Sequence, residues 1–317
     1  MADNQLEVFV KSMQDKIASL KTMLKGQAKS FNVELRKFMK DSIDVDGKCL
    51  RPMLVFSAAF DQEFNDAVRE RATCVELIHL ASLIHDDIID KAQIRRGKPT
   101  VSKKYGLKEA VLIGDVLFSH ALTILTKHSH TALVKTLKTV KDLSEGELIQ
   151  NLLNANKEVG LKEYFKIIEN KTAILFALSC YLGASVSGDE DWAICAEEAG
   201  LEMGIAYQIY DDICDWTLST KESGKTVGTD LVSGKKTLPI FMLENCLDRK
   251  SKAKLLEFIE AKDDKSILAM MEENNVFELC HQEKDKYLAK AKKLLQKFDN
   301  GASQKLIEFC DAIESMR

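Results

Sequence analysis

The chain has 317 residues, of which 45 are Lys or Arg and 49 are Asp or Glu, so its formal net charge at pH 7 is −4. Hydrophobic residues make up 45% of the chain and charged residues 30%, which is typical of a globular protein and excludes a disordered or fibrous one. The slight acidic excess argues against nucleic-acid binding, which usually needs a basic surplus. The chain has only three prolines, which is few for the many turns of a β-sandwich and favours helices.

The sequence predicts a cytoplasmic protein. Charged residues interrupt every apolar stretch of the N-terminal segment MADNQLEVFVKSMQDK, which is therefore not a signal peptide. The longest apolar stretch, residues 173–186, is shorter than the roughly 20 residues of a membrane-spanning helix. Eight cysteines are scattered without a C-x-x-C pair, which argues against zinc and thioredoxin-like sites and indicates reduced, mostly buried thiols.

Helical periodicity dominates the chain from end to end, and no alternating β pattern competes with it. We expect buried or amphipathic helices over residues 69–90, 164–186, 196–216 and 287–298. Glycine and proline mark the expected loops, which are residues 44–48, 95–100, 187–191 and 219–239. No linker or internal repeat divides the sequence, so it predicts one all-α domain over residues 1–317.

Two acidic clusters of the form D-D-x-x-D stand near the ends of predicted helices. Their members are Asp86, Asp87 and Asp90 in the first, and Asp211, Asp212 and Asp215 in the second. On a helix, residues i and i+4 share a face, and residue i+1 is turned by about a hundred degrees. The outer aspartates of each cluster therefore lie one turn apart on one face.

A solvated helix face is the ordinary explanation of such a cluster, but each of these follows a long apolar segment. Like carboxylates about 4 Å apart repel by a few kcal/mol at an effective dielectric near 20, and burial adds to that cost. Hard divalent cations offset it, and oxygen ligands without His or Cys suit Mg²⁺, which favours phosphates as further ligands. The two clusters together predict a site for a magnesium diphosphate between two helices.

A diphosphate site also requires cations, and the sequence offers them beside both clusters. The candidates are Lys48, Arg51, Arg95, Arg96, Lys171, Lys225 and Lys235. Lys171 interrupts an apolar helix and therefore needs an anion, whereas the others could be ordinary surface charges. His79 shares a helix face with Asp86, and Gln208 shares one with Asp211, although either could be a satisfied core residue.

These residues stand in motifs that resemble the trans-isoprenyl diphosphate synthases, also called polyprenyl synthetases. The matching stretches, in order, are Gly47-Lys48-x-x-Arg51-Pro52, Glu76-Leu77-Ile78-His79, the first acidic cluster, Arg95 to Thr100, Gly114-Asp115-x-Leu117-Phe118, Gly146-Glu147-Leu148-x-Gln150, Lys171-Thr172-Ala173, Gln208 with the second acidic cluster, Gly224-Lys225-x-x-Gly228-x-Asp230-Leu231 and Gly234 to Pro239. One acidic motif is weak, but two with these spacers in order are specific. Asp46 departs from the family pattern, which usually has glycine there.

The resemblance implies an orthogonal bundle of helices around a deep central cavity, usually as a homodimer. It also implies that the six aspartates bind Mg²⁺ bridging to an allylic diphosphate, which Arg95, Lys171, Lys225 and Lys235 help to hold. Lys48, Arg51, His79 and Arg96 are implied to hold isopentenyl diphosphate, and Thr172 and Gln208 to face the allylic cation. No side-chain nucleophile is required, which agrees with the absence of a recognisable Ser-His-Asp or Cys-His set.

Product length depends, in this family, on residues below the first acidic cluster. Ala81 and Ser82 lie roughly 6–8 Å below Asp86 on a helix, and both are small, which resembles the long-chain synthases. A long-chain all-trans-polyprenyl diphosphate is the expected product, and a geranylgeranyl product is the alternative, because bulky residues deeper in the cavity could also stop growth.

Two further functions remain open from the sequence. A class I terpene cyclase ionises the same substrates, but it would not need Lys48, Arg51 or a second complete acidic cluster. A non-catalytic partner subunit of a heteromeric synthase would typically lose aspartates or basic ligands, which this chain keeps. Transient membrane contact would suit the release of a long product, although no anchor is apparent.

Overall fold

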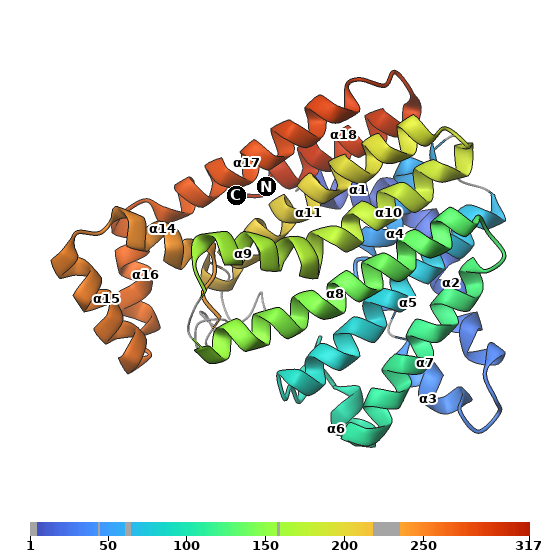
Figure 1. The fold of residues 1–317 in the computed structure, drawn as a ribbon, viewed down its shortest axis with the longest axis horizontal. Helices are drawn as coiled ribbons and strands as arrows, with labels where there is room; N and C mark the ends of the chain where they lie inside the picture. Colours follow the sequence, from blue (N-terminus) through green and yellow to red (C-terminus); the bar gives the residue numbers. More distant parts are fainter. Residues whose placement is uncertain (1–4, 44, 61–64, 157–158, 218–234) are drawn as a thin grey trace.

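The protein is helical almost throughout, as the computed structural model in Figure 1 shows. It describes residues 5–43, 45–60, 65–156, 159–217 and 235–317, so Lys225 of the predicted site lies outside the described residues. The elements of the first half are α1 (Gln5–Ser12), α2 (Gln14–Gln27), η1 (Ala28–Ser30), α3 (Arg36–Ser42), α4 (Leu50–Ala58), α5 (Asp66–Ile89), β1 (Ile94–Arg95), β2 (Lys98–Pro99), α6 (Val101–Tyr105), α7 (Leu107–Leu125) and α8 (His130–Asn156). The all-α prediction is confirmed.

The second half carries the other acidic cluster and ends in a long helix pair. Its elements are α9 (Leu161–Ile168), η3 (Glu169–Ala173), α10 (Ile174–Ala184), η4 (Ser185–Ser187), α11 (Glu190–Thr217), α14 (Leu238–Cys246), α15 (Arg249–Ala261), α16 (Asp264–Glu273), α17 (Val276–Leu295) and α18 (Gly301–Glu314). The loop expected over residues 187–191 is shorter than predicted, because Gly188 takes a left-handed conformation (φ 81°) and α11 already begins at Glu190.

Helix α5, which carries the first acidic cluster, is the central helix of the main bundle. Asn65 caps its N-terminus by accepting a hydrogen bond from the backbone N–H of Ala67, a contact worth about 1 kcal/mol. Apolar residues surround most of its length, so it packs against α4 and α10 as well as α7. Its first turn and its C-terminal turn leave the core, and the C-terminal turn carries Asp86 and is followed by Asp90. The cluster is therefore held on a rigid support.

Close packing of α11 against α10 and η3 fixes the second acidic cluster. A Cβ atom at Gly204 would lie 2.5 Å from the Cα of Ala173, and one at Gly200 would lie 2.9 Å from the Cα of Ala177. Real Cβ atoms do not approach backbone that closely, so any larger residue would push the helices apart. The two glycines thus hold α11 at the distance from which its aspartates reach the cavity.

Residues 94–99 form a short antiparallel hairpin where the sequence predicted a loop. Ile94 pairs with Pro99 and Arg95 with Lys98, and the two residues between them, Arg96 and Gly97, both have left-handed φ values of 50° and 72°. Two such residues are typical of a tight two-residue turn. The hairpin presents Arg95 and Arg96 side by side at the end of α5.

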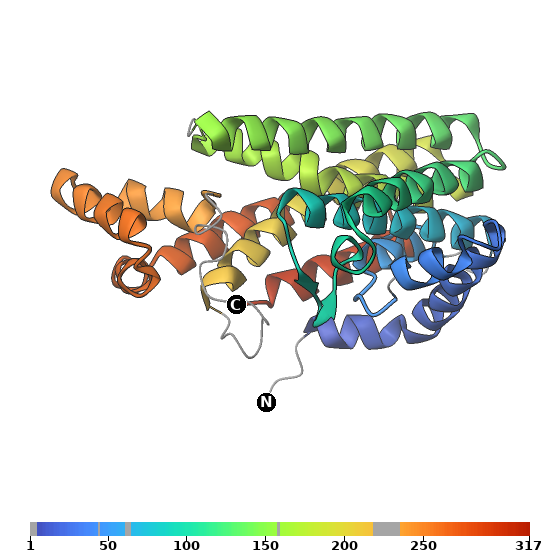
Figure 2. The same ribbon diagram turned by 90° about the horizontal axis from the view of Figure 1, so that it is seen from below.

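A second, smaller core lies at one end of the molecule. Helices α14, α15 and α16 project beyond the main bundle there, as Figures 1 and 2 show. Helices α11 and α17 contribute residues to both cores, so they join this extension to the bundle. Among the residues that the structure describes, each helix is too short or too polar to span a lipid bilayer.

Candidate active site

A cavity of about 270 Å³ opens where the C-terminal parts of α5 and α11 face each other. Its polar lining comes from five separate parts of the chain and brings both acidic clusters together. The lining residues are Leu83, Asp86, Asp90, Arg95, Gln150, Val159, Tyr164, Ile167, Ile168, Lys171, Thr172, Gln208, Asp211, Asp212, Lys235, Lys236 and Thr237. Most of the predicted diphosphate site is therefore assembled around one space.

Asp86 is a carboxyl group of the cavity whose pKa is strongly perturbed. Burial raises its pKa to about 6, and the neighbouring Glu147 and Asp90 act in the same direction. Lys171 opposes this shift. A carboxylate in such surroundings gains a large electrostatic benefit from a bound cation.

Lys171 is the buried cation that the sequence singled out. Its Nζ lies 2.5 Å from Oε2 of Glu147 and donates a hydrogen bond of 3.2 Å to Oε1 of Gln150. Burial lowers the pKa of Lys171, but Asp86 and Glu147 outweigh burial and hold the pKa above its ordinary value. Lys171 therefore stays charged, with Glu147 as its partner.

Asp90, at the outer end of α5, pairs with a residue from the far side of the cavity. The Nζ of Lys235 lies 3.0 and 3.1 Å from the two carboxylate oxygens of Asp90. Asp90 is about two-fifths exposed, so this ion pair is solvated and readily exchanged for other partners. The pair links the start of the α14 segment to the first acidic cluster.

The second cluster has one exposed and one buried aspartate on the cavity. Asp211 is exposed, whereas Asp212 is buried and accepts hydrogen bonds at both carboxylate oxygens. Tyr164 donates to Oδ2 at 2.6 Å and Gln208 Nε2 donates to Oδ1 at 2.8 Å. Asp215 is half-buried and is absent from the cavity lining that the described residues form.

Thr172 and Lys171 stand on a π-helical turn, η3, at the junction of α9 and α10. Such wide turns occur frequently at functional sites because they displace side chains from the regular helical positions. Thr172 donates a hydrogen bond of 2.7 Å to Oε1 of Gln208 on α11. The two residues predicted to face an allylic cation are therefore in direct contact.

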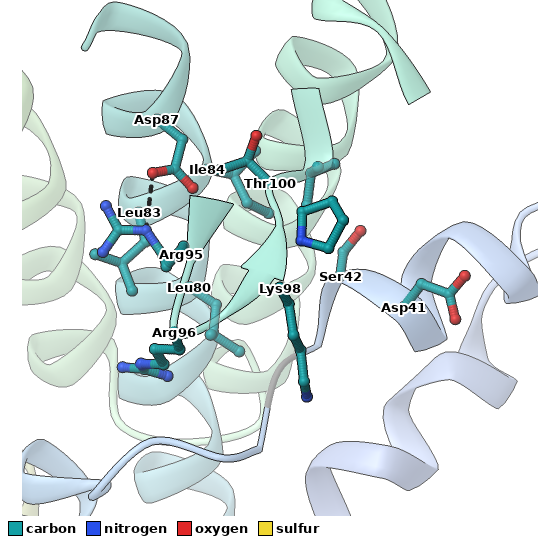
Figure 3. A pocket seen from close by; sticks show the side chains of 12 residues that line it. Asp41, Ser42, Leu80, Leu83, Ile84, Asp87, Arg95, Arg96, Lys98 and Thr100 are labelled. Atoms are coloured by element: carbon teal, nitrogen blue, oxygen red, sulfur yellow. Dashed lines mark hydrogen bonds and ion pairs between the residues drawn. The ribbon is translucent and has the colours of Figure 1, made fainter. Parts of the chain in front are cut away.

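Asp87 points away from the cavity and contacts the hairpin. It is 4% exposed, and its Oδ1 accepts a hydrogen bond of 2.8 Å from Nε of Arg95. Figure 3 shows the pair, with Asp87 on α5 and Arg95 on the hairpin, beside a separate cavity of about 100 Å³. Arg95 lines both cavities, so Asp87 fixes the position of a cation that reaches the diphosphate site.

The residues predicted to hold isopentenyl diphosphate lie near one another beside α5. Nη1 of Arg51 and Nε2 of His79 are 3.2 Å apart, and burial, together with Arg51, holds the pKa of His79 well below its ordinary value. The neutral ring therefore accepts a hydrogen bond from Arg51. Arg96 lies against Gly47, where a Cβ atom would be 2.8 Å from Nη1 of Arg96.

Lys48, the remaining cation of this group, is exposed immediately before α4. Its charge lowers the pKa of Cys214 on α11, while burial of that thiol raises the pKa more strongly.

Ala81 and Ser82 occupy different surroundings on α5. Ala81 is fully buried within the main core, whereas Ser82 is half-buried and bonds to the carbonyl of His79 at 2.8 Å. Neither residue lines the cavity as the described residues form it.

The cavity residues suit a divalent cation, although no three His, Cys, Asp or Glu side chains of the described segments already form a metal-binding group. Asp86, Asp90 and Asp211 present only oxygens to the space, and Lys171, Arg95 and Lys235 surround them. Oxygen donors that are too few for a closed site fit Mg²⁺, which completes its shell with water and phosphate.

Three residues of this site, Glu147, Gln150 and Tyr164, had no role predicted from the sequence. Glu147 and Gln150 belong to a recognised motif, and their partner Lys171 was the signal that could have found them. Tyr164 stands in no quoted motif, because its hydrogen bond to Asp212 joins residues 48 positions apart. Spacing within a sequence does not reveal such a pair.

Comparison with known proteins identifies a family that matches most of the chain. Residues 32–274 match the family model described as polyprenyl synthetase. Heptaprenyl diphosphate synthase component 2 of Bacillus subtilis is 32% identical over 266 residues, covering 83% of this chain and 76% of that protein. Geranylgeranyl diphosphate synthase of Methanosarcina mazei is 38% identical over 213 residues, covering 65% and 66%.

Solved structures share the whole fold. The polyprenyl synthase of Caulobacter crescentus, crystallised with calcium and isoprenyl diphosphate, has a TM-score of 0.86 at 27% identity and covers 98% of this chain and 97% of that one. Decaprenyl diphosphate synthase of Rhodobacter capsulatus has a TM-score of 0.85 at 26% identity, covering 98% and 99%. The family model, the relatives and the fold agree that the resemblance in the motifs is real, and the chain belongs to the polyprenyl synthetase family.

Proposed function

We propose that the protein condenses isopentenyl diphosphate with an allylic diphosphate, head to tail and in the trans configuration, to give a long-chain polyprenyl diphosphate. The observation that carries this proposal is the meeting of both acidic clusters and Lys171 at one cavity. Carboxylates on two helices with cations between them suit the binding and ionisation of a diphosphate.

The allylic diphosphate is held by the cations at the cavity rim. Lys171, Lys235 and Arg95 bind its phosphate oxygens, with Lys171 exchanging Glu147 for the substrate. Asp86, Asp90 and Asp211 would hold Mg²⁺, which when bound neutralises charge on the diphosphate and makes it a better leaving group. We include Lys225 and Asp215 in the wider site on the family resemblance, and we place the buried Asp87 and Asp212 behind it, where they accept hydrogen bonds from other residues of the protein.

The chemistry then needs a cation to form and be captured. The allylic C–O bond breaks with its electron pair leaving on the diphosphate, and the oxygens of Thr172 and Gln208 face the resulting cation. Lys48, Arg51, His79 and Arg96 hold isopentenyl diphosphate, whose double bond forms the new C–C bond. Loss of a proton, to the departed diphosphate, restores a double bond.

The product is proposed to be long because Ala81 and Ser82 are both small. An aromatic residue at either position would shorten the space below Asp86. The relatives include heptaprenyl and decaprenyl as well as geranylgeranyl synthases, so a geranylgeranyl product is the second candidate.

We also propose that this enzyme is a cytoplasmic, single-domain homodimer. Exposed apolar residues support the dimer: Leu107 and Leu112 on α7, and Leu137, Leu148 and Leu152 on α8. Figure 2 shows α8 along the outer edge of the bundle, where it is open to a second copy. The Bacillus subtilis relative is called a component 2, so a heteromeric partner is the other candidate for this surface.

Product analysis tests the activity. The pure protein is incubated with Mg²⁺, labelled isopentenyl diphosphate and farnesyl diphosphate, and chain length is read by chromatography after dephosphorylation. A ladder ending at six to eight isoprene units is expected. A stop at geranylgeraniol would support the proposed reaction but would mean that residues other than Ala81 and Ser82 limit the length of the product. No incorporation with farnesyl, geranyl or dimethylallyl diphosphate would refute a stand-alone synthase and favour a partner subunit or a cyclase.

A further inference from the structure

We infer that Tyr164 and Asp212 are positioning residues. They orient the Thr172 hydroxyl group so that its oxygen lone pairs, and not its proton, face the reacting cation. The inference rests on the proposed function and assigns Tyr164 a role in it. It follows from three hydrogen bonds that join α9, η3 and α11 in one chain.

The direction of this chain is set at Asp212. A carboxylate accepts hydrogen bonds and donates none, so Asp212 forces both of its neighbours to donate. Tyr164 does so at 2.6 Å through its hydroxyl group, and Gln208 does so at 2.8 Å through Nε2. With Nε2 committed to Asp212, the amide of Gln208 cannot flip, and its Oε1 faces Thr172.

Thr172 therefore has one available role toward Gln208. Because Oε1 only accepts, the Thr172 hydroxyl group must donate its proton to it, at 2.7 Å. Because the proton points toward Gln208, the lone pairs of the hydroxyl oxygen face the cavity. Lone pairs stabilise a developing positive charge, whereas a hydroxyl proton in the same place would oppose it.

Burial makes the arrangement rigid. Tyr164 is 3% exposed, with the rings of Phe165 and Phe241 at 5.2 and 5.8 Å, and Asp212 is also 3% exposed. Burial, with Asp212 beside it, raises the pKa of Tyr164 well above its ordinary value, so the phenol keeps the proton that it donates. A buried donor chain of this kind costs free energy to rearrange.

Substitution of Asp212 should reverse the direction of the hydrogen bonds that run from Thr172 through Gln208 to residue 212. In Asp212→Asn the new amide can donate to Oε1 of Gln208, which turns Nε2 toward Thr172 and the Thr172 proton into the cavity. We expect kcat to fall about a hundredfold, comparable with the loss of one oxyanion donor, with both KM values unchanged within about twofold. Tyr164→Phe, which removes one donor and leaves the carboxylate, should lower kcat about tenfold.

Coupling to Thr172 distinguishes this role from a general structural one. In a Thr172→Val background there is no hydroxyl group to orient, so Tyr164→Phe should have little further effect on kcat. Additive losses would overturn the inference. The melting temperatures of the variants report folding, and if Asp212→Asn does not fold, the Tyr164→Phe and Thr172→Val cycle decides.

Metal binding is the alternative role for Asp212, and calorimetry separates the two. Titration of the metal-free protein with Mg²⁺ and inorganic pyrophosphate should give the same affinity for Asp212→Asn as for wild type, whereas Asp211→Asn should bind more weakly. Weaker binding by Asp212→Asn would overturn the inference. A crystal structure at about 1 Å resolution adds a readout independent of activity, because Nε2 of Gln208 facing Thr172 would refute the chain even in an inactive protein. Failure of wild type to incorporate isopentenyl diphosphate would instead refute the proposed function.

Discussion

Two aspartates that are adjacent in the sequence have different surroundings in this protein. Asp86 faces the cavity, where burial raises its pKa to about 6, while Asp87 is turned into the core and bonds Arg95. Helical geometry separates neighbouring residues by about a hundred degrees, which is enough to give one a ligand and the other a protein partner. The contrast makes the cost of a cavity-facing carboxylate measurable.

Asp86→Asn should stabilise the metal-free protein near neutral pH. The folded-state pKa of about 6 exceeds the ordinary value of 3.8, so the stability contributed by the bound proton is present below about pH 4 and is lost as the pH rises through about 6. Removing the charge should recover about 1 kcal/mol at pH 7.5, after a discount for solvent screening, and nothing at pH 4.

Thermal unfolding in a chelating buffer at the two pH values measures this effect. Asp90→Asn is the matched control, because Asp90 is about two-fifths exposed and paired with Lys235. An Asp86→Asn variant that is less stable than wild type at pH 7.5 would contradict the prediction.

The turn residues of the hairpin depend on a glycine far away in the sequence. Arg96 lies so close to Gly47 that alanine there would bring a methyl group within 2.8 Å of the guanidinium group. Gly47→Ala should therefore displace Arg96 and raise the KM for isopentenyl diphosphate about tenfold, while the allylic KM stays unchanged. The side-chain end of Arg96 can move, so the melting temperature should change little.

Steady-state kinetics with each substrate varied in turn measure the effect of Gly47→Ala. Gly26→Ala is the control, since an added Cβ atom on α2 meets nothing within 4 Å. Equal increases in both KM values would argue that Gly47 affects the whole cavity and not Arg96 alone.

The packing of α5 distinguishes the two positions that are predicted to limit product length, Ala81 and Ser82. Ser82 is half-buried and stands one turn before Asp86, so a larger side chain there displaces fewer core atoms than one at a fully buried position. Ala81 has no exposed surface, so a phenylalanine at that position must displace core residues at a cost of about 1–3 kcal/mol. We expect Ser82→Phe to shorten the product at nearly unchanged melting temperature.

Ala81→Phe should also shorten the product, with a lower melting temperature. Chromatography of the dephosphorylated products compares both variants with wild type. If active Ser82→Phe and Ala81→Phe variants both make products of wild-type length, other residues of the protein stop the growth of the prenyl product.

Much of this element-level organisation could be predicted from the sequence. Periodicity identified the segments of α5, α10, α11 and α17, because a buried helix face requires apolar residues at a regular spacing in the sequence. The hairpin was predicted as a loop, since two-residue strands carry no periodic signal. The π turn of η3 was missed because it depends on packing against α11, which local sequence does not report.

The same distinction applies to the site. The spacing of the first acidic motif predicted that Asp86 and Asp90 share a face, and both line the cavity, whereas Asp211 is the one outer aspartate of the second motif in the lining that the described residues form. The partners of the inner aspartates come from other elements: Arg95 from the hairpin, and Tyr164 from α9. Only the folded chain brings them together.

At the scale of the whole molecule, the apolar residues of α7 and α8 predict association. Leu137 and Leu148 are 46% and 62% exposed, and they lie on one face of α8, eleven residues apart. Several large apolar side chains exposed on neighbouring helices are typical of a protein interface. We expect the wild-type protein to sediment as a dimer and a Leu137→Glu, Leu148→Glu variant as a monomer.

Analytical ultracentrifugation over a range of concentrations measures the oligomeric state. Leu256→Glu is the control, because Leu256 is 58% exposed on α15, which belongs to the projecting extension. A wild-type monomer that forms a complex only with a second, different chain would contradict the homodimer and favour a heteromeric synthase.

The π turn at residues 169–173 has a consequence for how such a site can arise and be lost. A π turn contains one residue more than a regular helical turn, so it is structurally equivalent to a single-codon insertion in an uninterrupted helix. Deleting Asn170 would restore regular winding and rotate α9 by about a hundred degrees relative to α10. Tyr164 would then leave Asp212, and Lys171 would leave Glu147, although every side chain that we assign to the chemistry would still be encoded. The smallest possible change in length would thus separate the residues of the site without altering any of them.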